Sequence, residues 1–192
     1  MVRRGALQVG DHVQLRGPKG ILHTITLEAG GSFHTHKGQI FHDELIGHPE
    51  GSVVTTDRDV AYLALRPMLS DFVLSMARGA AIIYPKDAAQ IVSLADIQPG
   101  HRVMEAGVGS GALSMSILRA VGEQGSLISL ERREEFADIA RANAEAFFGH
   151  PLSQWSIEVG NFQDLATAHP EGSVDRVVLD MLAPWECVEA VS

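Results

Sequence analysis

The stretch VMEAGVGSGA, residues 103–112, decides how the second half of the chain folds. Apolar residues lead into three alternating glycines, Gly107, Gly109 and Gly111, a pattern typical of a strand that turns sharply into a helix. Glycines at such a turn let the backbone approach a ligand closely and present amide groups at a helix N-terminus. The stretch therefore predicts a nucleotide-containing cofactor; the alternative is a tight turn that holds no ligand.

The glycine pattern fits two classes of cofactor. Gly-x-Gly-x-Gly is common in S-adenosylmethionine-dependent methyltransferases, but Gly107, Gly109 and Ala112 also match the Gly-x-Gly-x-x-Gly/Ala pattern of dinucleotide-binding proteins. Glu131 closes the next predicted strand, where its carboxylate can accept hydrogen bonds from both ribose hydroxyls of either cofactor. The alternative for Glu131 is that it opens a solvated charge run with residues 132–135.

Strands and helices alternate on both sides of this turn. The predicted strands cover residues 102–106, 126–131, 156–159 and 175–180, and the predicted helices cover residues 112–121 and 134–148. Apolar strands that alternate with helices are typical of a parallel sheet covered on both faces. We therefore predict an α/β fold with a doubly wound, Rossmann-like domain.

The beginning of the chain has a different texture. Short β-capable runs at residues 11–16 and 21–27 are separated by turn residues, which predicts a small sheet or barrel. Two helices are expected next, one over residues 70–78 and one that starts near Pro85 and buries Ala88, Ile91, Val92 and Leu94. The predicted parts are a β domain over residues 1–60, linking helices over 61–96 and the α/β domain over 97–192.

Two further strand ends carry polar side chains. Asn161 and Asp164 follow the third strand of the α/β domain, where an acceptor could read an adenine amino group; the alternative is an Asx turn that caps a short helix. Asp180 closes the fourth strand beside the glycine turn, in the crevice where such sheets bind ligands, and this is a catalytic position. Pro184 is expected to start another helix, and Trp185 to be a core residue.

The end of the chain is unusual. It stops soon after this helix begins, and an open sheet of four strands with a bare edge is a poor final structure for a stable domain. We therefore expect a C-terminal truncation that removes the last strands of the sheet.

Composition excludes several classes of protein. With 45% hydrophobic and 20% charged residues the chain is neither disordered nor fibrous, and it contains no long apolar run and no signal peptide, so we expect a cytoplasmic protein without a membrane span. Cys187 is the single cysteine, which excludes an internal disulfide. The net charge of −9 argues against a uniformly basic nucleic-acid binder. Among nine histidines, His34 and His36 lack a metal-binding pattern, so no metal site is expected.

At this point the residues match a known family. The chain resembles bacterial and archaeal tRNA (adenine-N1)-methyltransferases of the TrmI type, essentially from end to end. The resemblance rests on the order and spacing of short strings: HKG at 36–38, HD at 42–43, IG at 46–47, YLALRP at 62–67, SDF at 70–72, IYPKD at 83–87, EAGVGSG at 105–111 and LDMLAPWE at 179–186.

The resemblance implies S-adenosylmethionine as cofactor, tRNA as substrate, adenosine 58 of the T-loop as target and, in most cases, a homotetramer. It also implies a class I methyltransferase domain after a small β domain. The residues implied to bind the cofactor are Glu105, Gly107, Gly109, Ser110, Gly111, Ala112, Leu113, Glu131, Asn161 and Asp180, and those implied to serve the target base are Asp180 and Tyr84. Relatives often carry Asp at the position of Asn161, which keeps an acceptor but loses a charge.

Four readings of function stay open on the sequence. We expect Asp180 to accept a hydrogen bond from the amino group of a flipped adenine, with phosphate contacts from Arg3, Arg4, Arg16, Lys19 and Lys37. The alternatives are a tRNA-binding subunit without activity, methylation of an adjacent adenosine, and an NAD-dependent dehydrogenase. Tyr84 has the alternative of a plain core tyrosine.

Overall fold

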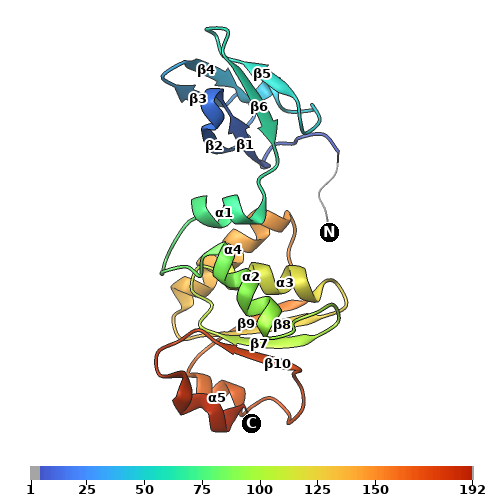
Figure 1. Ribbon diagram of the computed structural model, residues 1–192, viewed down its shortest axis with the longest axis vertical. Helices are drawn as coiled ribbons and strands as arrows, with labels where there is room; N and C mark the ends of the chain where they lie inside the picture. The colour runs from blue at the N-terminus through green and yellow to red at the C-terminus, as the bar shows by residue number, and fades with distance from the viewer. Residues whose placement is uncertain (1–4, 192) are drawn as a thin grey trace. The chain divides into compact units, whose positions relative to one another are not determined.

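The computed structural model describes residues 5–191 and divides the chain into two compact units, residues 1–75 and 76–192. Figure 1 traces the order of elements along the chain. Arg3 and Arg4, two of the predicted phosphate contacts, lie outside the described residues. No helix in the described range is long and apolar enough to cross a membrane.

The first unit is built on a four-stranded antiparallel sheet with the strand order β2-β1-β6-β5. Its strands are β1 (His12–Arg16), β2 (Leu22–Thr26), β5 (Val53–Thr55) and β6 (Ala61–Leu65); a separate hairpin joins β3 (Ser32–Thr35) to β4 (Gly38–Phe41), and 3-10 turns η1 (Pro18–Gly20) and η2 (His42–Glu44) connect them. Alternate residues of β1, Val13 and Leu15, pack with Ile40 of the hairpin and Leu45 in a shared core. This confirms the predicted small β domain.

The first unit extends beyond the predicted boundary at residue 60. Strand β6 pairs with β1, Leu15 opposite Ala64, so residues 61–65 complete the sheet and do not belong to linking helices. Helix α1 (Leu69–Ser75) also belongs to this unit and ends three residues earlier than predicted. The Ser75 hydroxyl lies 3.1 Å from the carbonyl oxygens of Asp71 and Phe72, and such back-bonding competes with continuation of the helix.

The second unit is a parallel sheet with the strand order β10-β7-β8-β9. Its elements are α2 (Pro85–Leu94), β7 (Arg102–Ala106), α3 (Ala112–Val121), β8 (Ser126–Glu131), α4 (Glu134–Phe148), β9 (Trp155–Val159), α5 (Phe162–Ala166), β10 (Arg176–Leu179) and the 3-10 helix η3 (Pro184–Ala190). Helices α2, α3 and α4 lie on one face of the sheet, and α5 and the C-terminal turn lie on the other (Figure 1). The predicted α/β fold is thus confirmed.

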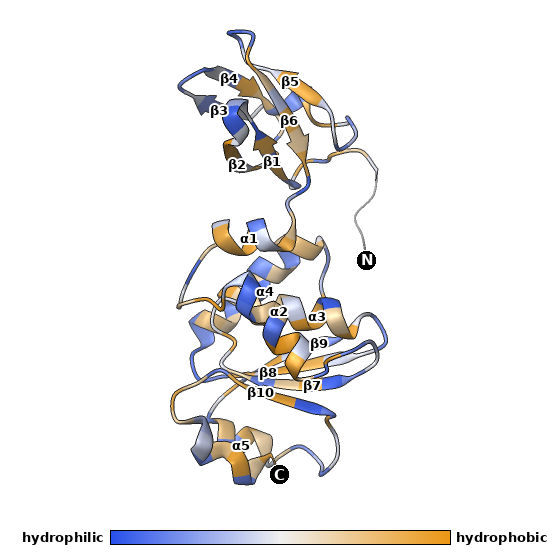
Figure 2. Ribbon diagram, in the orientation of Figure 1, coloured by the Kyte–Doolittle hydropathy of each residue, from blue (hydrophilic) through white to orange (hydrophobic). Residues whose placement is uncertain are grey.

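Apolar strand residues supply both faces of this sheet. On one face Met104, Leu130 and Phe162 form a cluster with Cys187, which is completely buried. Helices α3 and α5, which cover opposite faces of the sheet, also carry hydrophobic residues (Figure 2). The predicted burial of α2 is correct only for Ala88, since Ile91 and Val92 are partly buried and Leu94 is 86% exposed. The predicted burial of Trp185 is wrong: it is 73% exposed, and η3 buries Cys187 instead.

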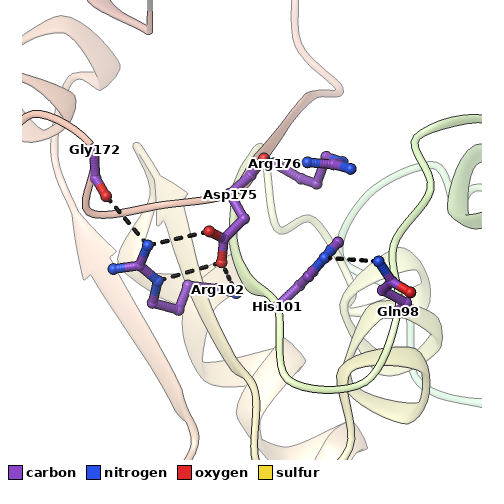
Figure 3. A network of polar contacts seen from close by, with 6 residues as sticks. All are labelled: Gln98, His101, Arg102, Gly172, Asp175 and Arg176. Carbon is purple, nitrogen blue, oxygen red and sulfur yellow. Dashed lines mark hydrogen bonds and ion pairs between the residues drawn. The ribbon is translucent and has the colours of Figure 1, made fainter.

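Arg102 and Asp175 clamp β7 and β10 together at the amino-terminal edge of the sheet (Figure 3). The Asp175 carboxylate accepts hydrogen bonds from the Arg102 backbone N–H (2.8 Å) and from its Nε (3.3 Å) and terminal nitrogen (3.1 Å). These bonds lower the pKa of Asp175 to about 2. Arg176 donates from Nε to the carbonyl oxygen of Ala95 at 2.7 Å. The clamp sets the register of β10, and therefore the place of Asp180 at its other end.

Candidate active site

The turn between β7 and α3 brings three structural elements into close contact. Gly107, Gly109 and Gly111 have φ angles of +63°, +52° and +82°. A Cβ atom on Gly107 would lie 2.6 Å from the carbonyl oxygen of Asp180, and one on Gly111 would lie 3.2 Å from Cα of Ala140. Both the conformation and the close approach of β10 and α4 therefore require glycine, and the turn presents backbone rather than side chains.

Glu131 holds this turn from the end of β8. Its Oε2 accepts the Gly109 N–H at 3.2 Å, and its Oε1 accepts the N–H groups of Arg132 and Arg133 at 2.9 and 3.1 Å. Glu131 is buried, whereas residues 132–135 are exposed, so the alternative of a solvated charge run is wrong for this residue. The carboxylate thus links the glycine turn to the backbone that follows β8.

Glu105 lies behind the turn and is completely buried. Its Oε1 accepts hydrogen bonds from the hydroxyls of Ser114 and Ser129, the second at 2.8 Å, and Ser129 in turn accepts the Trp155 indole N–H at 2.7 Å. Within the described part of the chain, Oε2 has no hydrogen-bond partner. Burial, together with the charge of Asp180, raises the pKa of Glu105 to about 7 despite both serine bonds. Glu105 therefore lies beneath the glycine turn and is shielded from solvent.

The side chains of Ser110, Ala112 and Leu113 also point away from the solvent, and all three residues are at most 5% exposed. The Ser110 hydroxyl accepts the N–H groups of Gly79 and Ala80 at 3.2 and 3.3 Å. A ligand at this turn would therefore meet the backbone of these residues.

Asp180 lies at the carboxyl end of β10, directly beside the turn. Its N–H donates to the carbonyl oxygen of Ala106 at 2.6 Å, which holds it against the end of β7. The residue is open to solvent, but partial burial of its carboxyl group raises its pKa above the usual value. An acidic group that is accessible yet partly desolvated can accept a hydrogen bond from an amino group and stabilise a nearby cation.

Asn161 and Tyr84, the two remaining predicted side chains, each directly precede a helix. Asn161 follows β9, next to the Glu131 strand end through the Gly160 N–H bond to the Glu131 carbonyl oxygen at 2.8 Å. It precedes α5 without a side-chain cap bond, so the Asx-cap alternative is wrong, and its Nδ2 lies 3.5 Å from Asp164. Tyr84 precedes α2 and is 51% exposed, which contradicts the alternative of a core tyrosine.

The histidines of the first unit have structural and surface positions. His42 is buried and its Nδ1 accepts the Glu28 N–H at 3.0 Å, while His34 and His36 are exposed. Across residues 5–191, no three His, Cys, Asp or Glu side chains gather in an arrangement that could hold a metal ion.

Replacing Gly107 with Ala is expected to damage both stability and cofactor binding. The added Cβ would meet backbone of Asp180, so β10 must shift, and we expect a loss of about 3 kcal/mol in the free energy of unfolding. Gly100→Ala is the control, because Gly100 lies in the same unit and has a φ of +89° but no atom within 4 Å of an added Cβ. It should cost about 1 kcal/mol. Chemical denaturation compares the two; equal losses would contradict the role of close approach.

Two family models match the chain. "TrmI-like N-terminal" matches residues 5–54, and "tRNA methyltransferase complex GCD14 subunit" matches residues 59–192. Among curated proteins, the tRNA (adenine(58)-N(1))-methyltransferase TrmI of Thermus thermophilus is 38% identical over 178 residues, which cover 91% of this chain and 67% of that protein.

Two solved structures match nearly the full length of this chain. The tRNA (m1A58) methyltransferase TrmI from Aquifex aeolicus has a TM-score of 0.82 and 28% identity, covering 97% of this chain and 71% of that chain. A SAM-dependent O-methyltransferase from Thermotoga maritima has a TM-score of 0.87 and 32% identity, covering 96% of this chain and 68% of that chain. Both similarities extend across the two units described above.

Proposed function

Because the chain belongs to the family of the tRNA methyltransferase complex GCD14 subunit, we propose that it methylates N1 of adenosine 58 in the T-loop of tRNA. The cofactor is S-adenosylmethionine. One observation carries the proposal: Asp180, whose pKa is raised, lies beside a turn that requires glycine and therefore presents backbone atoms to a ligand. The dehydrogenase reading is set aside, since it accounts neither for Asp180 nor for the family match.

The residues at the carboxyl edge of the sheet fit this cofactor. The glycine turn offers backbone to the amino-acid part of the molecule, Glu131 offers carboxylate oxygens to the ribose hydroxyls, and Asn161 offers an amide to the adenine. Glu105, Ser110, Ala112 and Leu113 shape this cradle from behind. S-adenosylmethionine supplies a methyl group that is electrophilic because its sulfur carries a positive charge.

We assign Asp180 the central role toward the target base. N1 of adenine is a weak nucleophile whose lone pair lies in the ring plane, so the base must leave its stack before it reacts. The Asp180 carboxylate accepts a hydrogen bond from the exocyclic amino group, which increases electron density at N1. It also stabilises the positive charge that develops on the ring as N1 becomes methylated. Tyr84, half-exposed at the start of α2, lines the pocket against the flipped base.

The charge of the chain is divided unequally between its units. Residues 1–75 carry seven Lys and Arg against eight Asp and Glu, net −1, whereas residues 76–192 carry eight against sixteen, net −8. The first unit is therefore the better surface for a polyanion, and we propose that Arg16, Lys19 and Lys37 bind tRNA phosphates there. Arg16 and Lys19 are exposed and Lys37 is partly exposed; Arg66, by contrast, is bound to Asp11 at 2.7 Å.

Changing Arg16, Lys19 and Lys37 together to Gln is expected to raise the KM for tRNA by about tenfold or more and to lower the slope of log KM against log salt by about three. The Kd for S-adenosylmethionine should not change. Arg119→Gln, an exposed cation of the second unit, is the control. An unchanged salt slope in the triple variant would remove these residues from the tRNA contact.

The function is tested by incubating the chain with unmodified tRNA and methyl-labelled S-adenosylmethionine, followed by nucleoside mass spectrometry. We expect 1-methyladenosine, lost when adenosine 58 of the tRNA is replaced by guanosine; product that persists would place the methyl group on an adjacent adenosine. Cofactor binding without any methylated nucleoside would instead indicate a tRNA-binding subunit, and a ribose-methylated product would indicate an O-methyltransferase. A homotetramer and a cytoplasmic location, both expected above, remain predictions.

A further inference from the structure

Residues 77–81, the irregular segment that follows the first unit, lie between the glycine turn and α4. The Ser110 hydroxyl accepts the N–H groups of Gly79 and Ala80 and lies 3.4 Å from the Ala80 carbonyl oxygen. On the other side, a Cβ atom on Gly79 would lie 2.7 Å from Cδ1 of Ile139. The segment is thus fixed on two sides, and it leads directly to Tyr84.

Asn143 of α4 joins this segment to the turn with a single side chain. Its Nδ2 donates to the carbonyl oxygen of Ala77 at 2.8 Å and to that of Ser110 at 3.0 Å. Asn143 is only 6% exposed and lies beside Ala140 and Ala144, which are completely buried. A buried amide on an apolar helix face is costly unless its hydrogens are bonded, and here both are used on backbone carbonyls from separate segments.

The bond to the Ser110 carbonyl orients one peptide plane of the turn. The Ser110 carbonyl and the Gly111 N–H belong to the same planar peptide group, so fixing one fixes the other. The Gly111 N–H in turn donates to the Val108 carbonyl oxygen at 2.9 Å, which closes the turn. Asn143 therefore acts on the conformation of the backbone that faces the cofactor, although its own side chain is buried.

We propose that Asn143 is a positioning residue for cofactor binding: it clamps residues 77–81 to the glycine turn and so holds the turn in its binding conformation. This inference rests on the proposed function, because the turn is taken to bind S-adenosylmethionine. Loss of the clamp loosens two walls of the site at once, the turn itself and the segment that carries the chain to Tyr84. The main consequence is weaker cofactor binding.

The test is Asn143→Asp, which keeps the shape of the side chain but replaces both N–H donors with an oxygen that repels the two carbonyls. We expect its Kd for S-adenosylmethionine, measured by calorimetry, to rise about tenfold or more. The KM for the cofactor should rise likewise, with a smaller change in kcat. Trypsin should cut the Arg78–Gly79 bond faster, because Arg78 is exposed and the bond that holds the neighbouring Ala77 carbonyl is lost.

Leu152→Ala is the matched control, since Leu152 is buried in the same unit and follows α4 at its far end. It should lower Tm but leave the Kd for S-adenosylmethionine within about twofold of the wild-type value. Should Asn143→Asp fail to fold, Asn143→Ala removes the same two donors without adding charge, and it should also weaken cofactor binding.

Wild-type affinity in Asn143→Asp, or in Asn143→Ala if the first variant does not fold, would overturn the positioning role even if trypsin cuts faster. The result is separate from a failure of the proposed function. If the wild-type chain itself does not bind S-adenosylmethionine, the proposed function and this inference both fail.

Discussion

Replacing Asp180 with Ala is expected to lower kcat for tRNA methylation by about 10²- to 10³-fold while the Kd for S-adenosylmethionine changes by less than about threefold. The reason is its place: Asp180 is open to solvent at the carboxyl end of β10, and its backbone N–H and carbonyl lie against Ala106 and Gly107. The Asp180→Ala substitution therefore removes the acceptor for the target base and leaves the cofactor-binding residues in place. Single-turnover rates and calorimetry measure the two quantities separately.

Asp180→Asn refines this result, because it keeps the size of the side chain and a hydrogen-bond acceptor but removes the charge. A loss close to that of Asp180→Ala would assign most of the effect to charge stabilisation. Asp138→Ala is the control, since Asp138 is an exposed carboxylate on α4 whose side chain is 68% exposed and pairs with Arg141. Equal losses of rate and cofactor affinity in Asp180→Ala would contradict a role directed at the base and favour one in cofactor binding.

Glu105 is expected to make stability fall as the pH rises from about 4.5 to about 7. Burial raises its folded-state pKa to about 7 from an ordinary value of 4.5, so the folded protein binds this proton more tightly than the unfolded chain does. The resulting stabilisation is complete below about pH 4.5 and is lost as the pH rises through 7. A shift of this size corresponds to about 3 kcal/mol.

Glu105→Gln resembles the protonated form and cannot ionise, so its unfolding free energy should lack this decline and exceed that of the wild type at pH 8. Denaturation at pH 5, 6, 7 and 8 gives the difference between the two proteins at each pH. Because the charge of Asp180 also raises the pKa of Glu105, Asp180→Asn should move the decline to lower pH. Parallel pH profiles for wild type and Glu105→Gln would show that Glu105 keeps one protonation state throughout.

Local patterns in the sequence predicted where the candidate site residues lie in the fold. The glycines of residues 107–111 and the carboxylates of Glu131 and Asp180 stand at strand ends, and the ends of parallel strands meet at one edge of a sheet. Apolar strands and short turns also predicted both architectures. These features depend on residues that are close in sequence, so they can be predicted without knowing the three-dimensional contacts.

Contacts between distant segments could not be predicted in the same way. Nothing near Asn143 in the sequence points to the carbonyl of Ala77, and the serines that hold Glu105 look like ordinary helix and strand residues. The exposure of Trp185 and the pairing of β6 with β1 likewise depend on where other elements pack. One signal was available: Asn143 lies among the small apolar residues on the buried face of α4, and a buried polar side chain requires a hydrogen-bond partner.

Strand β10 leaves little room for changes in chain length. Asp175 is clamped to Arg102 at one end, and Asp180 is bonded to Ala106 at the other, with four strand residues between them. A one-residue insertion would displace Asp180 by about 3.3 Å and turn its side chain toward the opposite face of the sheet. Natural or designed variants of this domain can therefore change the residues of β10, whereas insertions and deletions must fall outside residues 175–180.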